Sequence, residues 1–245
     1  MCTVSWLRHS DGYVLLCNRD ERHTRQPALG PRINQRAGVS FIAPADGDHG
    51  GSWIAVNQFG LTLCLLNRYG DEPVNESDKY ISRGLLLIKL IHCATAANVR
   101  SRIESTNLAE FRPFTLAMIS LAEHPLVLDW TGRELRVRFE LESHAPLTSS
   151  SKEREIGISR REQFQQLLAT VVDQEPSQMT DLLWRFHGSH LPERGPMSVC
   201  MHRAEAATVS LSAVNVGRKS IEFVYQPGSP CREAPLETVV LARLG

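Results

Sequence analysis

The sequence has no surplus of charge of either sign, because 27 Lys and Arg residues balance 27 Asp and Glu residues in a chain of 245. Without a basic surplus, the composition gives no support for binding to nucleic acid or to a membrane surface. Long apolar runs are lacking too. The richest, at residues 85–91, is interrupted by Lys89 and is too short to span a bilayer. The chain start lacks the basic and apolar segments of a secretory signal, so we expect a cytoplasmic protein.

Cysteine is sparse and has no pattern of its own. The six cysteines show neither Cys-x-x-Cys spacing nor the density of a disulfide framework. They are Cys2, Cys17, Cys64, Cys93, Cys200 and Cys231. Most lie within apolar segments, so we expect them to be reduced and structural.

The apolar pattern alternates between strand-like and helix-like segments. It predicts two hairpins and a charged loop (71–79) in about the first eighty residues, helices over 81–91 and 96–104, strands over 114–141, a helix from Ser159, another over 179–186, and strands over 197–202, 208–216 and 220–225. Residues 23–36 are polar and contain prolines, which predicts an irregular loop. Ser159-Arg160-Arg161-Glu162 has the form of a capping box at a helix start. No composition shift divides the chain, so we predict one α+β domain, residues 1–245, with two antiparallel sheets and helices outside.

Cys2 directly follows Met1, and its small side chain permits removal of the methionine. Removal would leave a thiol and a free α-amine on one residue. The thiolate can attack a carbonyl, and the amine, with an ordinary pKa of roughly 7.7–8, can take the proton. Asp11-Gly12 predicts a tight turn in a hairpin that returns residues 18–21 to the chain start. The alternative is a Met-Cys start with no meaning beyond a small residue after methionine.

Several motifs carry a resemblance to known families. They are Met1-Cys2-Thr3, Asn18-Arg19-Asp20-Glu21 and Gly50-Gly51-Ser52-Trp53, with Asn57 and Asn67. Together they resemble the NRDE family, also called the transport-and-Golgi-organisation 2-like family. The start and the Asp-Gly turn are also similar to those of choloylglycine hydrolases and penicillin V acylases. The resemblance covers about the first seventy residues well and the remainder in element order. It implies the four-layer αββα sandwich of amino-terminal-nucleophile hydrolases.

The resemblance also implies roles for individual residues. Cys2 would be the nucleophile, and Arg19 and Asp20 would hold and polarise it, since a nearby arginine lowers the pKa of a thiol. Asn67 would donate to the developing oxyanion. Arg203 would correspond to a late arginine near the nucleophile of the acylases. Taken singly, Arg19 and Asp20 also fit a surface ion pair at a strand end.

Four further residues are predicted to contact the substrate. They are Asn18, Glu21, Trp53 and Asn57. Asparagine also bonds readily to nearby backbone, so a turn-capping role for Asn57 stays open, as it does for Asn67. Trp53 fits an ordinary core residue equally well.

The sequence departs from the acylase pattern in two places. Arg19 and Asp20 are adjacent here, whereas two residues separate the arginine and the aspartate in the acylases. Residues 147–151, where a later asparagine is expected at the oxyanion site, carry hydroxyl groups and no amide. A serine can still donate a hydrogen bond there.

Cys200-Met201-His202-Arg203 contains ligand types that suit haem iron, copper or zinc. On a strand, Cys200 and His202 would share one face. No second group of ligands has a recognisable spacing, because His187 and His190 fall on a predicted helix end and loop. We therefore predict no bound metal and no cofactor.

Two functions fit these observations. The first is a cysteine amino-terminal-nucleophile hydrolase that cleaves a non-peptide amide through an acyl-enzyme on Cys2. The second is a binding or trafficking protein for haem or an acyl lipid on the same fold, which the resemblance to the NRDE family implies. Both predict a small-molecule partner and leave open whether the chain forms a homo-oligomer, because a fold alone does not decide a function.

Overall fold

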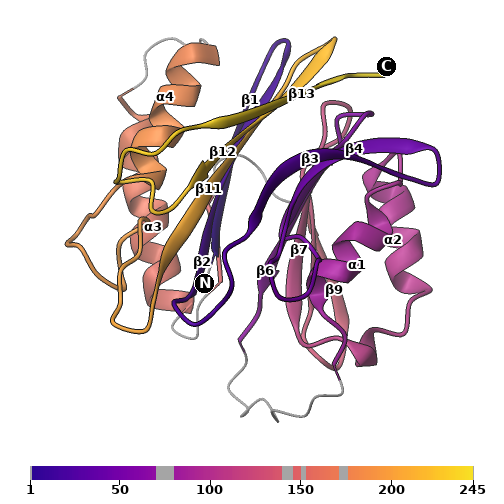
Figure 1. Cartoon of the computed structure of the whole chain (residues 1–245), viewed down its shortest axis with the longest axis horizontal. Coiled ribbons are helices and arrows are strands. Elements are labelled where there is room, and N and C mark those ends of the chain that lie inside the picture. The colour runs from indigo at the N-terminus through magenta and orange to yellow at the C-terminus, as the bar shows by residue number, and fades with distance from the viewer. Residues whose placement is uncertain (1, 70–79, 140–145, 150–152, 171–175, 245) are drawn as a thin grey trace.

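The computed structural model describes residues 2–69, 80–139, 146–149, 153–170 and 176–244. Two antiparallel sheets face each other, and a pair of helices covers the outer side of each (Figure 1). This arrangement confirms the predicted α+β sandwich. The charged loop predicted at residues 71–79 lies outside the described residues.

The first sheet has six strands and contains both the chain start and the last strands of the sequence. Its order is β10 (Leu147–Thr148), β1 (Cys2–His9), β2 (Gly12–Arg22), β11 (Ala206–Val216), β12 (Ser220–Pro227) and β13 (Glu237–Ala242). The predicted hairpin at the chain start is β1 and β2, joined at Ser10 and Asp11. A bulge between Thr208 and Ser210 shifts the register of β11 against β2.

The second sheet has seven strands in sequence order. They are β3 (Leu29–Arg36), β4 (Val39–Ala45), β5 (Ile54–Asn57), β6 (Thr62–Asn67), β7 (Phe114–Ile119), β8 (Leu126–Trp130) and β9 (Leu135–Phe139). Each strand pairs antiparallel with the next, which short connections and one helical excursion permit.

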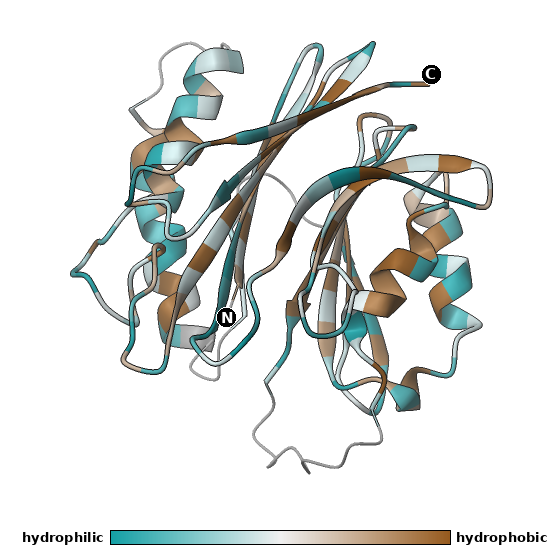
Figure 2. Ribbon diagram, in the orientation of Figure 1, coloured by the Kyte–Doolittle hydropathy of each residue, from teal (hydrophilic) through white to brown (hydrophobic). Residues whose placement is uncertain are grey.

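The helices are α1 (Arg83–Leu90), α2 (Ala96–Glu104), the 3-10 turn η1 (Leu108–Glu110), α3 (Glu153–Leu168) and α4 (Pro176–His187). Helix α1 packs on β5 and β6, and Figure 2 shows hydrophobic residues along its ribbon in brown. Leu86, Leu87 and Leu90 of α1 are buried. Helix α4 packs on β1 and β2. The central strands of each sheet are therefore buried on both faces, one against a helix pair and one against the other sheet, while the edge strands β3, β9 and β13 are largely exposed.

Alternation along β2 assigns its side chains to two faces. The Tyr13 hydroxyl donates to the Gly60 carbonyl (3.0 Å) in the second sheet. The Asn18 amide donates to the His187 carbonyl (3.0 Å) in α4. Odd-numbered residues of β2 therefore face the second sheet, and even-numbered residues face the helices.

Three predicted elements differ in the structure. Residues 29–36 form β3 and not an irregular loop; most of this edge strand is exposed, so it carries no apolar alternation. Helix α3 begins at Glu153 and not at Ser159, whose hydroxyl accepts from the Gln163 amide (3.3 Å) within the helix. Residues 197–202 form no strand, because the buried backbone there bonds to turns, as Cys200 N does to Ser189 O (3.0 Å).

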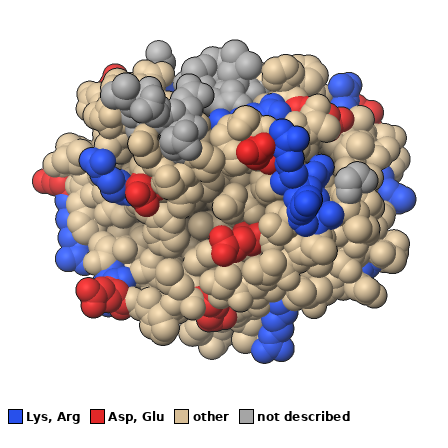
Figure 3. Space-filling view, turned by 90° about the horizontal axis from the view of Figure 1, so that it is seen from above, with Lys and Arg blue, Asp and Glu red and all other residues tan. Residues whose placement is uncertain are grey.

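Charged side chains do not gather by sign on the face seen from above. Figure 3 shows basic and acidic groups interspersed over a largely uncharged surface, as the balanced composition predicts. Within the described residues, no helix is both long enough and apolar enough to cross a membrane.

Candidate active site

Strand pairing at the chain start places Cys2 directly opposite Arg19. Residues opposite each other in an antiparallel pair share one face, so both side chains lie on the side of the second sheet. Cys2 is 8% exposed and Arg19 is 4% exposed. The first residues of β1 lie at the lower end of the first sheet (Figure 1). The hairpin thus brings the predicted nucleophile and the predicted arginine together.

Arg19 is held from two directions. Its guanidinium lies 4.5 Å from the ring centroid of Trp53, a cation–π distance, and donates to the Asp46 carboxylate at 2.5 Å. Glu21 is 3.7 Å away. Burial raises the pKa of Asp46, but the hydrogen bonds from Arg25 and from the His49 backbone, together with the charges of Arg25 and Arg19, outweigh burial and hold this pKa below its usual value. Asp46 is therefore an anion, and Trp53 and Glu21, which the sequence predicts to contact the substrate, both lie beside Arg19.

Asp20 lies on the opposite face of β2, toward the helices. Its carboxylate accepts a hydrogen bond from the Thr208 hydroxyl (2.6 Å). Burial raises the pKa of Asp20, while the positive amino terminus, Arg160, the Thr208 bond and Arg203 oppose that rise. The Asp20 carboxylate therefore interacts electrostatically with the chain start, but it lies on the opposite face of the sheet from the Cys2 thiol.

Arg160 is a buried arginine of α3, and the sequence pattern predicts for it only a place in a capping box. It is fully buried and donates to the Thr3 hydroxyl and to the carbonyls of Met197 (3.3 Å) and Ser198 (2.5 Å). Its charge also interacts with those of Asp20 and Cys2. One signal could have found it: Arg160 shares a helix face with apolar residues one turn to either side, Ile156 and Phe164.

The backbone of Cys2 is fixed by Ser149, which follows β10. Cys2 N donates to the Ser149 hydroxyl oxygen (2.7 Å), and Ser149 N donates to the Cys2 carbonyl (3.0 Å). The hydroxyl that stands in the stretch where the acylases have an asparagine thus receives a hydrogen bond from the chain start. This role needs an oxygen acceptor and no amide.

The thiol of Cys2 is neutral in this environment. Burial raises its pKa to about 12, although the positive amino terminus and a backbone hydrogen bond from Asp20 act against the rise. Arg83, the first residue of α1, is a second arginine whose charge interacts with Cys2 and with Glu21. It donates to the Pro113 carbonyl (2.8 Å). Sequence spacing gives no sign that Arg83 lies near the chain start.

Two predicted asparagines are engaged within the fold. Asn18 is fully buried and bonds through its amide to the backbone of His187 and Val199, and its carbonyl oxygen lies 3.0 Å from His187 Nδ1. The Asn57 amide donates to the Ile91 and Cys93 carbonyls, and its oxygen accepts from two backbone amides of the following turn. Both side chains are fully buried and direct their amide hydrogens to backbone carbonyls, and Asn57 has the turn-capping role that the sequence left open.

Asn67 and Arg203 are placed by the structure at strand and loop ends. Asn67 ends β6, and its amide lies 3.4 Å from the Tyr69 hydroxyl. Within the described residues, no hydrogen bond connects Asn67 with Cys2. Arg203 follows His202, and its charge lowers the pKa of Asp20 against the effect of burial. The structure therefore associates Arg203 with Asp20.

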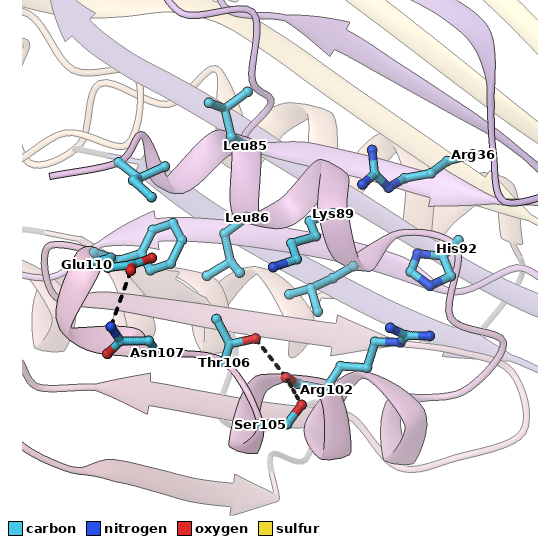
Figure 4. A pocket seen from close by; sticks show the side chains of 13 residues that line it. Arg36, Leu85, Leu86, Lys89, His92, Arg102, Ser105, Thr106, Asn107 and Glu110 are labelled. Carbon is cyan, nitrogen blue, oxygen red and sulfur yellow. Dashed lines mark hydrogen bonds between the residues drawn. The ribbon is translucent and has the colours of Figure 1, made fainter.

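A hollow of about 540 Å³ lies on the far side of the second sheet, between α1 and α2 (Figure 4). Arg36, Lys89, His92 and Arg102 line it together with Glu110. Asn107 and Glu110 are hydrogen-bonded at its edge (3.2 Å). None of the catalytic or substrate-binding residues predicted from the sequence lines this hollow, and it is separate from the chain start.

The sequence profile of the family described as Transport and Golgi organisation 2 matches residues 1–220. The chain belongs to this family. No curated protein matches the sequence of this family member. Solved structures do match it. Penicillin V acylase from Agrobacterium tumefaciens superposes with a TM-score of 0.58 at 8% identity, over 98% of this chain and 86% of the acylase.

Two further solved structures also match the chain. The C2A mutant of conjugated bile acid hydrolase from Clostridium perfringens gives a TM-score of 0.55 at 13% identity, over 100% of this chain and 97% of the hydrolase. The N-acylethanolamine-hydrolyzing acid amidase ortholog of Caenorhabditis elegans gives 0.57 at 12% identity, over 87% and 92%. At such identities the likeness establishes the fold, that of the amino-terminal-nucleophile hydrolases, and leaves activity to the site.

Proposed function

We propose that this family member is a cysteine amidohydrolase that acts on a small, non-peptide amide once Met1 has been removed. The observation that carries the proposal is the position of Cys2 N. This nitrogen is hydrogen-bonded to Ser149 at 2.7 Å and belongs to the residue whose thiol lies opposite the buried Arg19. Removal of Met1 converts the same nitrogen into an α-amine that the fold already holds in position.

The α-amine is the base that this site needs. A thiol with a pKa of about 12 holds its proton at neutral pH, so attack requires transfer of that proton as the bond forms. The Cys2 amine takes the thiol proton, sulfur attacks the amide carbonyl, and the C–N bond breaks as the amine returns the proton to the leaving nitrogen. Water, deprotonated by the same amine, then hydrolyses the thioester and restores the thiol.

Charges around Cys2 fit the changes in charge during this cycle. Arg19 and Arg83 supply positive charge toward Cys2, and a thiolate or oxyanion is stabilised by such groups. Asp20, with Arg160 and Arg203 near it, balances the ammonium form of the amine from the helix side of the sheet. Asn67 remains our candidate for the oxyanion donor.

The substrate class is inferred from the solved structures of the same fold. They are named as an acylase of penicillin V, a hydrolase of conjugated bile acids and an N-acylethanolamine-hydrolyzing amidase. These names support a small amide substrate with an acyl group. A buried thiol between two sheets also suits a small acyl chain better than a polypeptide.

Intact-mass spectrometry before and after a small thiol-acylating probe tests the proposal. We expect loss of Met1 and a single adduct on Cys2, which Cys2→Ser abolishes and Arg19→Ala diminishes. Arg22→Ala is the matched control, because Arg22 lies on the same strand and is exposed. A retained Met1, or equal labelling of the Arg19 and Arg22 variants, would refute the hydrolase.

A specific observation keeps the second function in view: the Cys2 thiol has its pKa raised to about 12, and Ser149 provides no amide. A Cys2 thiol that stays protonated and unreactive fits a binding protein for haem or an acyl lipid on the same fold. The test is titration with hemin. A Soret band that survives Cys2→Ala and is lost in His202→Ala would favour binding over hydrolysis.

A further inference from the structure

Four side chains of the types that can ligate a metal, from three separate segments, lie close together beside β11. His190 follows α4, Cys200 and His202 belong to the loop before β11, and Cys231 follows β12. One ligand atom from each lies within 4.8 Å of every other. We propose that these residues form a tetrahedral site, with two cysteine and two histidine ligands, for a structural zinc ion.

The distances around His202 match the edges of a zinc tetrahedron. Zn–N and Zn–S bonds of about 2.0–2.1 Å and 2.3 Å give ligand separations of about 3.3 Å for two nitrogens and about 3.5 Å for nitrogen and sulfur. His202 Nε2 lies 3.2 Å from His190 Nε2, 3.4 Å from Cys200 Sγ and 3.6 Å from Cys231 Sγ. All three separations therefore agree with a common ion at the centre.

Hydrogen bonding alone does not explain this convergence. A neutral imidazole nitrogen either donates one proton or accepts one bond, yet three ligand atoms lie within 3.6 Å of His202 Nε2. A bound ion replaces these competing contacts with one bond from each ligand. Two thiolates would also neutralise the two charges of Zn²⁺, and a mixed nitrogen and sulfur set is the one that zinc prefers.

A bound ion would cross-link two segments of the fold. Cys200 is buried and Cys231 is exposed, so the ion would connect the inner loop to the surface turn after β12. The same loop carries Met201. Its backbone N donates to Thr208 Oγ1 (2.8 Å), and the Thr208 hydroxyl in turn donates to Asp20. Zinc would thus fasten the segment that supports the Asp20 side of the chain start, independently of whether Cys2 is catalytic.

Metal analysis of the whole chain tests the proposal. We expect one zinc per chain by elemental analysis, and, after chelation and addition of Co²⁺, the visible bands of tetrahedral cobalt with thiolate-to-cobalt charge transfer. Cys231→Ser and His190→Gln should each weaken zinc binding at least about 10-fold, since even the loss of an outer partner costs that much. Chelation should lower the Tm of the wild type by more than that of Cys231→Ser.

Cys93→Ser and His49→Gln are the matched controls, since both residues lie outside the group of four, and both should bind zinc like the wild type. Substoichiometric zinc, a cobalt spectrum without thiolate charge transfer, or a Cys200–Cys231 disulfide in freshly purified protein would overturn the proposal. If the ligand variants do not fold, the wild-type cobalt spectrum alone decides. None of these results depends on Cys2, so they do not bear on the hydrolase.

Discussion

His187 should make the stability of this protein depend steeply on pH between 7 and 5. The imidazole is fully buried between Ser5 Oγ (2.8 Å from Nε2) and Asn18 Oδ1 (3.0 Å from Nδ1). Asn18 Oδ1 can only accept, so Nδ1 carries the proton and Nε2 accepts from the serine. Burial, with the nearby charge of Arg160, lowers the pKa of His187 to about 3.

The sign follows from proton binding. Between pH 6.5 and 3 the unfolded chain binds a proton at His187 that the folded chain does not, so stability falls as the pH falls through this window. From pH 7 to pH 5 the loss from this one group is about 2 kcal/mol. Asp20, whose pKa is raised by burial, acts in the opposite direction.

Urea unfolding at pH 5, 6 and 7 measures the effect, with His187→Gln as the variant and the exposed His49→Gln as the control. The glutamine variant is expected to be less stable at pH 7 and to lose about 2 kcal/mol less on acidification than the wild type. The comparison of slopes isolates His187, because all other titrating groups are common to both chains. An unchanged slope in the variant would refute the assignment of a buried, neutral imidazole.

Three further predictions concern buried hydrogen bonds of the first sheet. Arg160→Met should destabilise the fold by about 3–5 kcal/mol in urea unfolding, because it leaves the buried Thr3 hydroxyl, the buried Ser198 carbonyl and the half-buried Met197 carbonyl without their charged donor; a loss below 1 kcal/mol would contradict it. Ser149→Ala should slow acylation of Cys2 about tenfold while Ser149→Thr preserves it, since the loss of one hydrogen bond is worth about 1.4 kcal/mol. Tyr13→Phe should cost about 1 kcal/mol in unfolding and leave the acylation rate unchanged.

The parts of the fold that the sequence predicts are those with local signals. The Asp11-Gly12 turn fixes the register of the first hairpin, and this register alone places Cys2 opposite Arg19. Helix α4 was predicted from its apolar spacing and confirmed. Strand β3 escaped prediction because its stability comes from pairing with β4 rather than from burial, with Ile33 half exposed.

The missing parts of the site depend on contacts between distant segments. Arg160 lies 157 residues from Thr3, and Ser149 lies 147 residues from Cys2. No spacing rule connects residues so far apart, since only the folded topology brings them together. The same holds for His190 and Cys231: one precedes β11 and the other follows β12, and antiparallel pairing brings the start of β11 beside the end of β12, near His202.

The most direct test of the central claim compares two forms of the chain, one that begins at Cys2 and one that keeps a residue in front of it. With that residue present, a thiol pKa of about 12 should make alkylation at neutral pH on the order of 10²-fold slower than that of glutathione, after allowing for the greater nucleophilicity of a basic thiolate. The chain that begins at Cys2 should react at least as fast as glutathione, and Arg19→Ala should slow it. Equal, slow rates in both forms would contradict an amine-activated nucleophile.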